Sequence, residues 1–582
     1  MKMNGAKILI ESLKREGVEV IFGYPGGQVL PIFDALYDAD VNVEVIFGYP
    51  GGQVLPIFDA LYDADVKFIL TRHEQGAAHA ADGYSRATGK TGVCLATSGP
   101  GATNLTTGIA NAYMDSIPMI AITGQVKSFL IGNDAFQEAD VTGITRPITK
   151  HNYLVKDVKE LARTIHEAFY IASSGRPGPV LIDIPSDIQQ QETEFIWPEE
   201  IEIRSYKPTS FGHPGQIKKA AKLIASSKKP LIYAGGGIIT SGAHHELKKL
   251  TEKLNAPITW TLMGIGCFPA THKLSLGMLG MHGTAYANHA IMEADLILAI
   301  GARFDDRVTG RLDKFAPYAK VIHIDIDPTS ISKNVRVDIP IVGDAKNILG
   351  QLIEDMNKLP DTSEWLKTVE SWKKKYPLKY QDKKNIIKPQ YVVEQIYEAT
   401  KGKAIITTEV GQNQMWAAQW YKYDYPRTFI SSGGLGTMGF GFPAAMGAKI
   451  GMPDKIVFDI AGDGSIQMNI QELGTCVANK INVKIAILNN GYLGMVRQWQ
   501  ELVYKKRCSY TTMTNPDFVK LAESYGAVGI RVTKNEDVRK AIEKAISIDN
   551  VVFIDFQVEE EENVFPMVPA GEALNRMIEG LA

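Results

Sequence analysis

Residues 456–492 read IVFDIAGDGSIQMNIQELGTCVANKINVKIAILNNGY, and this stretch decides the fold of the last third of the chain. Two apolar runs, 456–461 and 483–488, flank a helical stretch, and each run ends in a polar turn. Runs this apolar are typical of strands that are buried on both faces of a parallel sheet. A right-handed crossover makes the two strands parallel, so we expect the GDG and NNG turns to emerge at the same carboxyl edge of the sheet.

The two turns carry residues that suit a metal ion and a phosphate. Asp463 and Asn490 lie 27 residues apart in the sequence, and the predicted crossover brings their side chains together. Carboxylate and amide oxygens are hard ligands suited to Mg²⁺, which also accepts phosphate oxygens. Gly462 and Gly464 would let the backbone approach an anion, and we expect a helix to begin at Ser465 with its N–H groups facing that anion. Either turn alone is more often an ordinary turn, but the pair at this spacing indicates a ligand site.

The same alternation of apolar runs and helical stretches extends over the whole chain, which at 582 residues is too long for one hydrophobic core. The runs fall into three groups, which predicts an α/β protein of three doubly wound domains with parallel sheets. Polar segments at 189–210 and 359–385 separate the groups. We therefore expect domains at residues 1–190, 191–375 and 376–582.

Composition and charge argue against several classes of partner. The net charge is only -3, so no broad field would recruit nucleic acid or an anionic membrane. No apolar run approaches the roughly 20 residues that a membrane span requires. The four cysteines show neither a metal-ligand spacing nor a disulfide framework, which favours a reducing compartment. Because the charged helix predicted over residues 1–17 lacks signal-peptide or transit-peptide character, we expect a cytoplasmic protein.

The first third of the chain contains an exact duplication. Residues 18–41, VEVIFGYPGGQVLPIFDALYDADV, recur without change as residues 43–66. Two copies at one spacing do not form a solenoid, and exact identity favours a recent duplication or an artefact over a functional repeat. The unit is typical of a strand, a Gly-rich turn and a helix, and a compact sheet has room for one. Because the second copy runs directly into residues 67–76, we expect it to hold the native position and the first to be looped out or mispaired.

The stretch KFILTRHEQGAAHAADGYSRATG, residues 67–89, places Glu74 at the carboxyl end of a predicted strand. An isolated HEQG is more often a helix cap than a functional group. Together, however, this stretch and the GDG and NN turns resemble the thiamine-diphosphate enzyme superfamily, whose members hold magnesium and the cofactor's diphosphate at such turns. The resemblance implies that Asp463, Asn490 and the backbone carbonyl of Tyr492 are the metal ligands. It also implies that Glu74 is the activating glutamate, which protonates the cofactor's pyrimidine ring.

Two further segments match that superfamily. In GGLGTMGFGFPAAMGA, residues 433–448, the match makes Met438 the apolar wedge beneath the bent cofactor and places Gly436 beside its aminopyrimidine ring. A methionine in such a run is normally core filler, so this assignment rests on the surrounding match. The motif EVGQNQM makes Gln412 part of the diphosphate-contacting segment. Family members commonly carry His where this chain has Asn413, although asparagine could still donate to an anion.

The resemblance covers essentially the whole chain apart from one copy of the repeat, and it narrows the family. Residues 98–126, 132–155 and 175–187 look like the N-terminal domain of the acetohydroxyacid (acetolactate) synthases, in which Phe136 and Gln137 would line the substrate site. In this superfamily the cofactor bridges the first and third domains of different subunits, which implies a homodimer or tetramer. The family's further partner is a small regulatory subunit.

The middle third carries the motifs YAGGG, WTLMG, GMLGMHGTAYAN, GARFDDRVTG and HIDIDP. No GxGxxG fingerprint is present, and FDDR taken singly is more often a surface ion-pair cluster. As a set, the motifs resemble the FAD-binding middle domain of the biosynthetic synthases, in which the flavin does no net redox work. The flavin contacts implied by this match are Arg176, Gly235, Gly236, Gly237, Thr261, Leu262, Met263, Met281, His282, Gly301, Ala302, Arg303, Arg307, Asp325, Ile326 and Asp327.

The segment LNNGYLGMVRQWQELVY places Trp499 one helical stretch beyond the predicted metal turn. An aromatic residue there is by default part of the core. The family's matching tryptophan lines the acceptor pocket and favours 2-oxobutanoate over pyruvate, a difference of one methylene that can supply about 1–3 kcal/mol. Tyr492 stands where the family usually has His, and we expect this change to be tolerated because only its carbonyl oxygen is expected at the metal.

The family's activity is therefore the expectation for this chain. Such an enzyme decarboxylates pyruvate and transfers the resulting two-carbon unit to pyruvate, giving 2-acetolactate, or to 2-oxobutanoate, giving 2-aceto-2-hydroxybutanoate, in branched-chain amino-acid biosynthesis. Two alternatives stay open on the residues alone. One is a pyruvate oxidase-like enzyme with a redox-active flavin. The other is a non-catalytic protein, if the repeat prevents the first domain from assembling.

Overall fold

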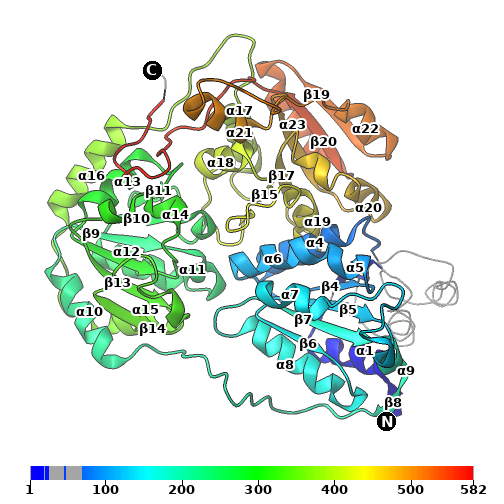
Figure 1. Ribbon diagram of the computed structural model, residues 1–582. Helices are drawn as coiled ribbons and strands as arrows, with labels where there is room; N and C mark the ends of the chain where they lie inside the picture. Colours follow the sequence, from blue (N-terminus) through cyan, green and yellow to red (C-terminus); the bar gives the residue numbers. More distant parts are fainter. Residues whose placement is uncertain (1, 19, 25–44, 47–68, 581–582) are drawn as a thin grey trace.

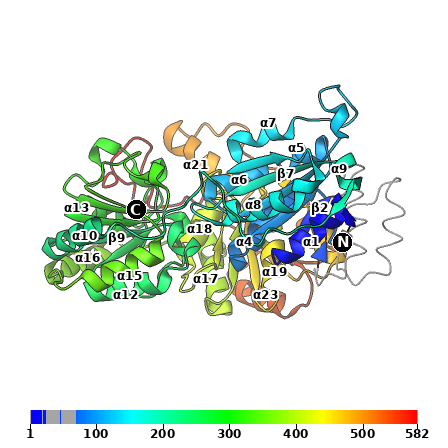
Figure 2. The same ribbon diagram turned by 90° about the horizontal axis from the view of Figure 1, so that it is seen from below.

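The computed structural model describes residues 2–18, 20–24, 45–46 and 69–580, which form three α/β units (Figure 1). Each unit is built on a six-stranded sheet in which neighbouring strands are parallel. Helices lie on both faces of the sheets (Figures 1 and 2), as expected for strands that are buried on both faces. The predicted fold class of three doubly wound parallel sheets is confirmed.

The N-terminal unit has the strand order β3-β2-β4-β5-β7-β6. Its first helix begins where the side chain of Asn4 accepts a hydrogen bond of 2.9 Å from the Lys7 N–H, a typical N-cap. Its strands are β2 (Val20–Tyr24), β3 (Val45–Ile46), β4 (Gly92–Ala96), β5 (Met119–Gln125), β6 (His151–Leu154) and β7 (Pro179–Pro185). Its helices are α1 (Gly5–Arg15), α4 (Glu74–Thr88), α5 (Pro100–Asn104), α6 (Thr106–Asp115), α7 (Val141–Thr145), α8 (Leu161–Ser173) and α9 (Ser186–Gln190).

The middle unit, on the left of Figure 1, has the strand order β11-β10-β9-β12-β13-β14. Its strands are β9 (Pro230–Ala234), β10 (Ile258–Trp260), β11 (Ser275–Met278), β12 (Leu296–Ile300), β13 (Lys320–Asp325) and β14 (Ile339–Val342). Its helices are α10 (Pro214–Ser226), α11 (Gly236–Thr240), α12 (His244–Leu254), α13 (Ala285–Glu293), α14 (Asp306–Thr309), α15 (Ala345–Asp355) and α16 (Ser363–Lys375).

The C-terminal unit has the strand order β16-β15-β17-β18-β20-β19. Its strands are β15 (Ile405–Thr408), β16 (Phe429–Ile430), β17 (Val457–Gly462), β18 (Lys484–Asn489), β19 (Val528–Val532) and β20 (Val552–Gln557). Its helices are α17 (Pro389–Thr400), α18 (Gln412–Trp420), α19 (Gly441–Gly451), α20 (Glu472–Ala478), α21 (Gly494–Val503), α22 (Phe518–Ser524) and α23 (Asn535–Ser547).

The duplicated strand is placed differently from our expectation. The first copy is not looped out, because its strand β2 lies inside the sheet and pairs with β4. The second copy supplies β3, which lies at the sheet edge with Val45 opposite Val20. The two copies are chemically identical, so only their connections can distinguish them. Helix α1 packs on the same core as Ile21 and ends at Arg15, close before β2, which explains why the first copy takes the inner position. Most of the repeat lies outside the described residues.

The N-terminal and C-terminal units are packed tightly together through α4 and α19, which lie side by side near the centre of Figure 1. Small residues make this close approach possible. A Cβ atom added at Gly83 would overlap the backbone oxygen of Ala444, and one added at Gly447 would overlap that of Ala80. One continuous cluster of buried side chains therefore spans both units.

Several short elements escaped the sequence prediction. The strands β6, β11 and β14 are short, and all three lie at sheet edges. A small antiparallel sheet of β1 (Lys2–Asn4) and β8 (Glu192–Glu194) was also missed. Beyond β8, Phe195, Trp197 and Ile203 still pack against the core of the N-terminal unit. The division at 1–190, 191–375 and 376–582 stays a prediction. Within the described ranges, no helix is long and apolar enough to cross a membrane.

Candidate active site

The crossover between β17 and β18 brings the GDG and NN turns together. The two strands pair in parallel with Gly462 opposite Leu488, so both turns leave the same edge of the sheet. The backbone N–H of Asn490 points at Oδ1 of Asp463 with an N···O distance of 3.4 Å. This confirms the prediction that Asp463 and Asn490, 27 positions apart in the sequence, lie side by side.

Asp463 has the surroundings of a metal ligand. Its exposure is 1%, and its Oδ2 accepts a hydrogen bond of 2.7 Å from the Asn515 amide. Burial raises the pKa of Asp463 to about 6, while the Asn515 hydrogen bond acts in the opposite direction. No Lys, Arg or His among the described residues forms an ion pair with this carboxylate. Because an unpaired buried charge is costly, a bound cation would complete the site.

The remaining predicted ligands lie beside Asp463. Among the residues that the structure describes, Asn490 Oδ1 accepts a single hydrogen bond, of 3.1 Å from the Tyr492 N–H, which leaves one of its lone pairs free. The backbone of Tyr492 and Thr512 forms an isolated bridge that holds this turn in place. Asp463, Asn490 and Tyr492 all line one cavity. The donor set of one carboxylate, one amide oxygen and one carbonyl fits a hard cation such as Mg²⁺.

The helix expected from Ser465 is wrong in detail. Ser465 is followed by a 3₁₀ turn, Ile466–Met468, and the α-helix α20 begins only at Glu472. Side-chain hydrogen bonds explain the interruption. Gln467 donates to the Asp463 carbonyl at 2.9 Å, and Asn469 donates to the Gly439 carbonyl at 2.7 Å. Polar side chains that bond the nearby backbone compete with helix formation in this way.

A second helix, α18, turns its N-terminus toward the cavity. Gln412 is its first residue, and its Oε1 accepts a hydrogen bond of 3.3 Å from the Asn490 amide. The expectation that Asn413 could donate to an anion is wrong. Both of its amide hydrogens are used within the protein, by the carbonyls of Glu409 at 3.0 Å and Ile460 at 2.8 Å. The amide hydrogens of Gln412 are likewise used, by Gln498 Oε1 and by the Glu562 carbonyl, both at 2.9 Å. At this helix the donors left for an anion are therefore the backbone N–H groups of its first turn.

The loop 432–438 carries the predicted wedge residue. Gly436 has a φ angle of +72°, a left-handed conformation that favours glycine, and it lines the cavity together with Met438. Beyond the loop, the carboxylate of Glu409 accepts hydrogen bonds from the Gly439 N–H at 2.6 Å and the Phe442 N–H at 3.1 Å. A buried carboxylate thus holds the far side of the turn that leads into α19.

Glu409 lies beside a second buried carboxylate, Asp459. Burial raises the pKa of Glu409 to about 8, although its backbone hydrogen bonds act in the opposite direction. Burial, and then the charge of Glu409, raise the pKa of Asp459 as well. A carboxyl group whose pKa is raised by folding stabilises the folded state below its unfolded pKa and loses that contribution as the pH rises through its folded pKa. We therefore expect Glu409 and Asp459 to weaken the fold as the pH is raised from about 5 to beyond 8.

Asp459→Asn should reduce this pH dependence, because the amide carries no charge at any of these pH values. Its oxygen can still accept the hydrogen bond of 3.0 Å that the Thr407 hydroxyl donates to Asp459 Oδ1. Thermal unfolding of the cofactor-free protein between about pH 6 and pH 9 measures the effect. The midpoint of the unaltered protein should fall more steeply than that of the variant, and the variant should be the more stable at the alkaline end. Parallel curves would show that this carboxyl does not titrate in the folded protein.

Glu74 begins helix α4, with His73 as the N-cap residue. Its exposure is 7%, and its Oε2 accepts a hydrogen bond of 2.9 Å from the Asn104 amide. The preceding turn is held by Glu472 of α20, whose Oε1 accepts hydrogen bonds of 3.0 Å from the N–H groups of Arg72 and His73. A helix of the C-terminal unit therefore fixes the turn that orients Glu74.

Most of the predicted site residues line a single cavity of about 1800 Å³ between the three units. This volume exceeds the roughly 300–1,000 Å³ of an ordinary ligand pocket, so there is room for more than one bound group. Four predicted residues do not line the cavity, namely Glu74, Phe136, Gln137 and Gly235. Gly235 instead lets two strand ends meet, because a Cβ atom there would overlap the Gly301 carbonyl oxygen.

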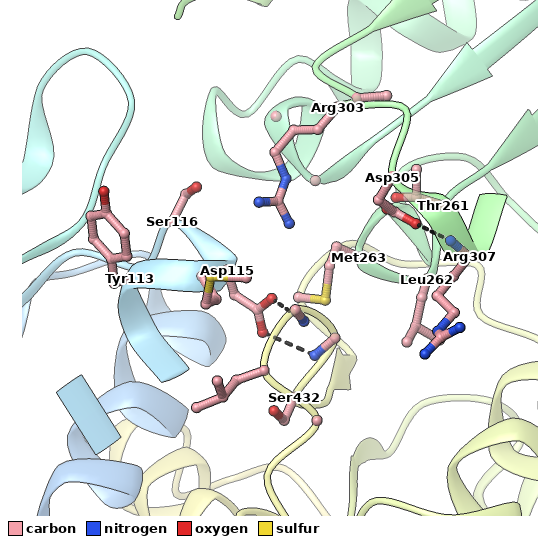
Figure 3. Close-up of a pocket in the computed structure, with 18 of the residues that line it drawn as sticks. Tyr113, Asp115, Ser116, Thr261, Leu262, Met263, Arg303, Asp305, Arg307 and Ser432 are labelled. Atoms are coloured by element: carbon pink, nitrogen blue, oxygen red, sulfur yellow. Dashed lines mark hydrogen bonds between the residues drawn. The ribbon is translucent and has the colours of Figure 1, made fainter. Parts of the chain in front are cut away.

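The residues expected at a flavin occupy the part of the cavity between the N-terminal and middle units. Figure 3 shows the Arg303 side chain extending into the open space there. His282 is buried, and its Nδ1 has no hydrogen-bond partner within the described part of the chain. Burial lowers the pKa of His282 to about 4, so the ring is neutral at pH 7. A buried, unpartnered ring nitrogen in a cavity that arginine side chains also line fits a polar ligand.

Phe136 and Gln137 lie on the N-terminal unit, on the same side as Glu74. Phe136 is 86% exposed, and Gln137 has a φ angle of +63°. A Cβ atom at Gly99 would lie 2.8 Å from the Gln137 carbonyl oxygen, and one at Gly101 would lie 3.3 Å from Glu74 Oε1. Glu74 and Gln137 therefore flank the same short segment, outside the cavity formed by this single chain.

Comparison with known proteins decides the family. Family models of the thiamine pyrophosphate enzymes match three parts of the chain. The N-terminal TPP binding domain matches residues 3–43 and 39–144, the central domain matches residues 217–352, and the C-terminal TPP binding domain matches residues 409–556. The chain is 51% identical to the acetolactate synthase large subunit of Haemophilus influenzae over 99% of its own length and 98% of that protein. The chain belongs to the acetolactate synthase large-subunit family.

Other members of this acetolactate synthase family match equally fully. The chain is 48% identical to the acetolactate synthase isozyme 3 large subunit of Escherichia coli, over 99% of the chain and 98% of that protein. It is 50% identical to a probable acetolactate synthase large subunit of Methanocaldococcus jannaschii, over 99% of the chain and 95% of that protein. The chain is accordingly a thiamine pyrophosphate-dependent enzyme of the acetolactate synthase type.

Sequence reasoning about this acetolactate synthase family member missed three residues at the site. Asn515 bonds Asp463, Glu409 bonds the turn after Met438, and Asp115 bonds the loop before it. Asn515 precedes a proline, a signal of a turn, but nothing in the sequence says which carboxylate that turn approaches. Asp115 and Glu409 act on segments more than 25 residues away, so no local pattern identifies them.

Proposed function

We propose that this chain is the catalytic subunit of an acetolactate synthase. It would convert two molecules of pyruvate into 2-acetolactate and CO₂, or one pyruvate and one 2-oxobutanoate into 2-aceto-2-hydroxybutanoate and CO₂. The observation that carries the proposal is a single cavity lined by Asp463 and Asn490 on one side and by the flavin-type residues on the other. The full-length similarity to acetolactate synthase large subunits supports it.

Mg²⁺ and the pyrophosphate would be held by the C-terminal unit. The proposed metal ligands are Asp463, Asn490 and the carbonyl of Tyr492. Gly464, Ser465 and the backbone N–H of Gln412, at the start of α18, would lie beside the phosphate oxygens. Thiamine pyrophosphate, when bound, supplies the carbon nucleophile that adds to the 2-oxo acid and takes up the electron pair released with CO₂. Met438 and Gly436 would fix the orientation of its two rings, which sets the geometry of attack.

Glu74 would hold and release the proton that activates the cofactor, and it would do so across a subunit interface. It lies outside the cavity of its own chain, as do Phe136 and Gln137. All three belong to the N-terminal unit, and Phe136 is strongly exposed. A second copy of the chain is the simplest source of these groups for each cavity, which supports a homodimer or a tetramer built from dimers.

FAD would occupy the part of the cavity bordered by the middle unit. The cavity volume, the buried Nδ1 of His282 and the exposed end of Arg303 support this assignment. Arg176 bonds Asp327 at 3.1 Å and would flank the flavin from the N-terminal unit. The strands β9, β12 and β13 end at this part of the cavity, the usual position for a nucleotide in an open α/β sheet.

Trp499 would set the preference for the acceptor. It lies on α21, immediately after the turn that contains Tyr492, and its half-buried side chain lines the cavity. An indole at this position favours the longer acceptor by packing against its extra methylene. The relatives are named large subunits, which supports a small regulatory subunit as a further partner. The four cysteines of the chain are unpaired, which fits a cytoplasmic location.

The decisive test is removal and return of the metal and cofactor. The purified protein, stripped with a chelator and dialysed, should form no acetolactate from pyruvate, and activity should return only when Mg²⁺ and thiamine pyrophosphate are added together. An anaerobic mixture with pyruvate adds a control for oxidase chemistry, because ligation leaves the flavin yellow and oxidation of the substrate bleaches it. Acetolactate formation without either component, or bleaching without acetolactate, would contradict the proposal.

A further inference from the structure

The C-terminal end of helix α6 lies where the three units meet (Figure 3). Asp115 is the last residue of the helix, and its carboxylate accepts two hydrogen bonds from the C-terminal unit. Oδ1 accepts from the Gly434 N–H at 2.7 Å, and Oδ2 accepts from the Gly433 N–H at 3.0 Å. One side chain thus binds two successive backbone groups of the loop that leads to Met438.

Arg86 holds Asp115 in position. Its guanidinium donates to Asp115 Oδ2 at 2.9 Å, and it also pairs with Asp82. A third hydrogen bond of 2.8 Å runs from Arg86 to the carbonyl of Ser431, directly before the loop. The side chains of this network are almost fully buried, and buried charge-assisted hydrogen bonds are among the strongest in proteins. The position of Asp115 is therefore set independently of any ligand.

Asn111, one turn earlier on α6, holds the other half of the same loop. Its side-chain oxygen accepts hydrogen bonds from the hydroxyl groups of Ser432 and Thr437. Ser432 Oγ in turn accepts a hydrogen bond of 2.8 Å from the Thr437 N–H, which closes the loop upon itself. Met438 follows directly. Each end of the loop is therefore tied to α6 of the N-terminal unit.

The loop has little room to move away from these contacts. A Cβ atom at Gly434 would lie 2.9 Å from Asp115 Oδ1, and one at Gly433 would overlap Met263 Sδ of the middle unit. Figure 3 shows the Asp115 carboxylate turned toward the loop that carries Ser432, with Met263 nearby. The two glycines pass between Asp115 and Met263. A larger residue at Gly434 would displace the loop, because its Cβ atom would also lie 3.1 Å from the Met114 carbonyl oxygen.

We propose that Asp115, held by Arg86, is a positioning residue for thiamine pyrophosphate. It fixes the loop 432–438 in the conformation in which Gly436 and Met438 line the cavity. The binding part of the proposal rests on the proposed function, whereas the structural part concerns the cofactor-free chain. The adjacent residue, Ser116, accepts a hydrogen bond of 2.8 Å from Arg176, so the same helix end also borders the flavin side of the cavity.

Hydrogen exchange of the cofactor-free protein tests the structural part. Asp115→Asn keeps the size of the side chain but leaves one acceptor oxygen for two N–H groups. Amide exchange at Gly433 and Gly434 should become about 10- to 100-fold faster, the range expected for a lost hydrogen bond to a charged group. Asp295→Asn is the matched control, because Asp295 also accepts from two successive N–H groups, those of Lys228 at 2.7 Å and Lys229 at 2.9 Å, but lies outside the cavity.

Cofactor titration of the same proteins tests the binding part. In the presence of Mg²⁺, Asp115→Asn should weaken thiamine pyrophosphate binding by about 10-fold or more, with much of the activity restored at saturating cofactor. Asp295→Asn should bind like the unaltered protein. Exchange rates at Gly433 and Gly434 equal to those of the control, or unchanged cofactor affinity, would overturn the proposal. Failure of the unaltered protein to bind the cofactor would instead refute the proposed function, and the exchange rates would still report on Asp115.

Ser432→Ala provides a second route if the Asp115 variant does not fold. It removes the acceptor of the Thr437 N–H without leaving a buried charge unpaired. Exchange at Thr437 should quicken and thiamine pyrophosphate binding should weaken in parallel, by about 3- to 10-fold. Unchanged binding despite faster exchange would show that the loop conformation does not limit cofactor binding, and the proposal would be wrong.

Discussion

Glu74→Gln should lower kcat/KM for acetolactate formation by about 10²- to 10⁴-fold, the usual contribution of a positioned proton-transfer group. Glutamine has the same shape, and its carbonyl oxygen can still accept the hydrogen bond of 2.9 Å that Asn104 donates to Glu74. It cannot exchange a proton at neutral pH. The helix α4 and the turn held by Glu472 should therefore remain intact while the proton step is lost.

Steady-state assays at saturating Mg²⁺ and thiamine pyrophosphate measure this loss, and flavin content and the thermal midpoint report on folding. Glu536→Gln is a matched control, because Glu536 also lies in the first turn of a helix, α23, but is exposed and remote from the cavity. Removing such a helix-terminal charge costs only about 0.3–1 kcal/mol. If Glu74→Gln retains the rate of this control, Glu74 is not the proton-transfer group.

Asp463→Asn should weaken Mg²⁺-dependent binding of thiamine pyrophosphate by about 10²- to 4 × 10³-fold. Removing one partner of a buried charge pair typically costs about 3–5 kcal/mol, which corresponds to that range of affinity. The thermal stability of the cofactor-free protein, by contrast, should not fall. Asp463 is 1% exposed and has no ion-pair partner among the described residues. Its charge therefore destabilises the folded protein when no cation is bound. Residues that serve function often lower stability in this way.

Two measurements separate the role of Asp463 as a metal ligand from a structural role. Titration with thiamine pyrophosphate at fixed Mg²⁺ gives the affinity, and thermal unfolding without cofactors gives the stability. The variant should lose affinity but unfold no earlier than the unaltered protein. Asp157→Asn serves as the control, because Asp157 accepts a hydrogen bond of 3.0 Å from the Lys159 N–H outside the cavity. A variant that binds normally would rule out Asp463 as a metal ligand, and one that unfolds early would attribute the lost affinity to a damaged fold.

The prediction from sequence was accurate where a property depends on neighbouring residues. The apolar runs on either side of the GDG turn identified β17 and β18 as parallel strands, since strands buried on both faces must be apolar throughout. Their common carboxyl edge then placed Asp463 beside Asn490 without knowledge of the rest of the sheet. The short strands β6, β11 and β14 were missed because polar residues, glycine or proline interrupt their apolar runs, which read HNYL, SLGM and IPIV.

The prediction failed where the outcome depends on a choice between equivalent partners. The two copies of the repeat have the same sequence, so no local rule could decide which strand pairs with β4, and the attachment of α1 to the first copy decided it. The helix expected from Ser465 failed for a related reason. Asn469 bonds the carbonyl of Gly439, a residue 30 positions earlier in the chain, and this long-range hydrogen bond outweighs the local preference for helix.

The sequence by itself determined the three parallel sheets, the edge at which Asp463 and Asn490 meet, and the family to which the chain belongs. These follow from hydrophobic patterns and turn residues, which act over a few positions along the chain. Only the tertiary structure decided which strand of the repeat is internal and that Glu74 lies outside the cavity of its own chain. It also decided that Asp115 accepts hydrogen bonds from the loop before Met438. Those features depend on which elements pack together in the folded chain, and the cost of burying a carboxylate is set by the partners that the whole fold brings to it.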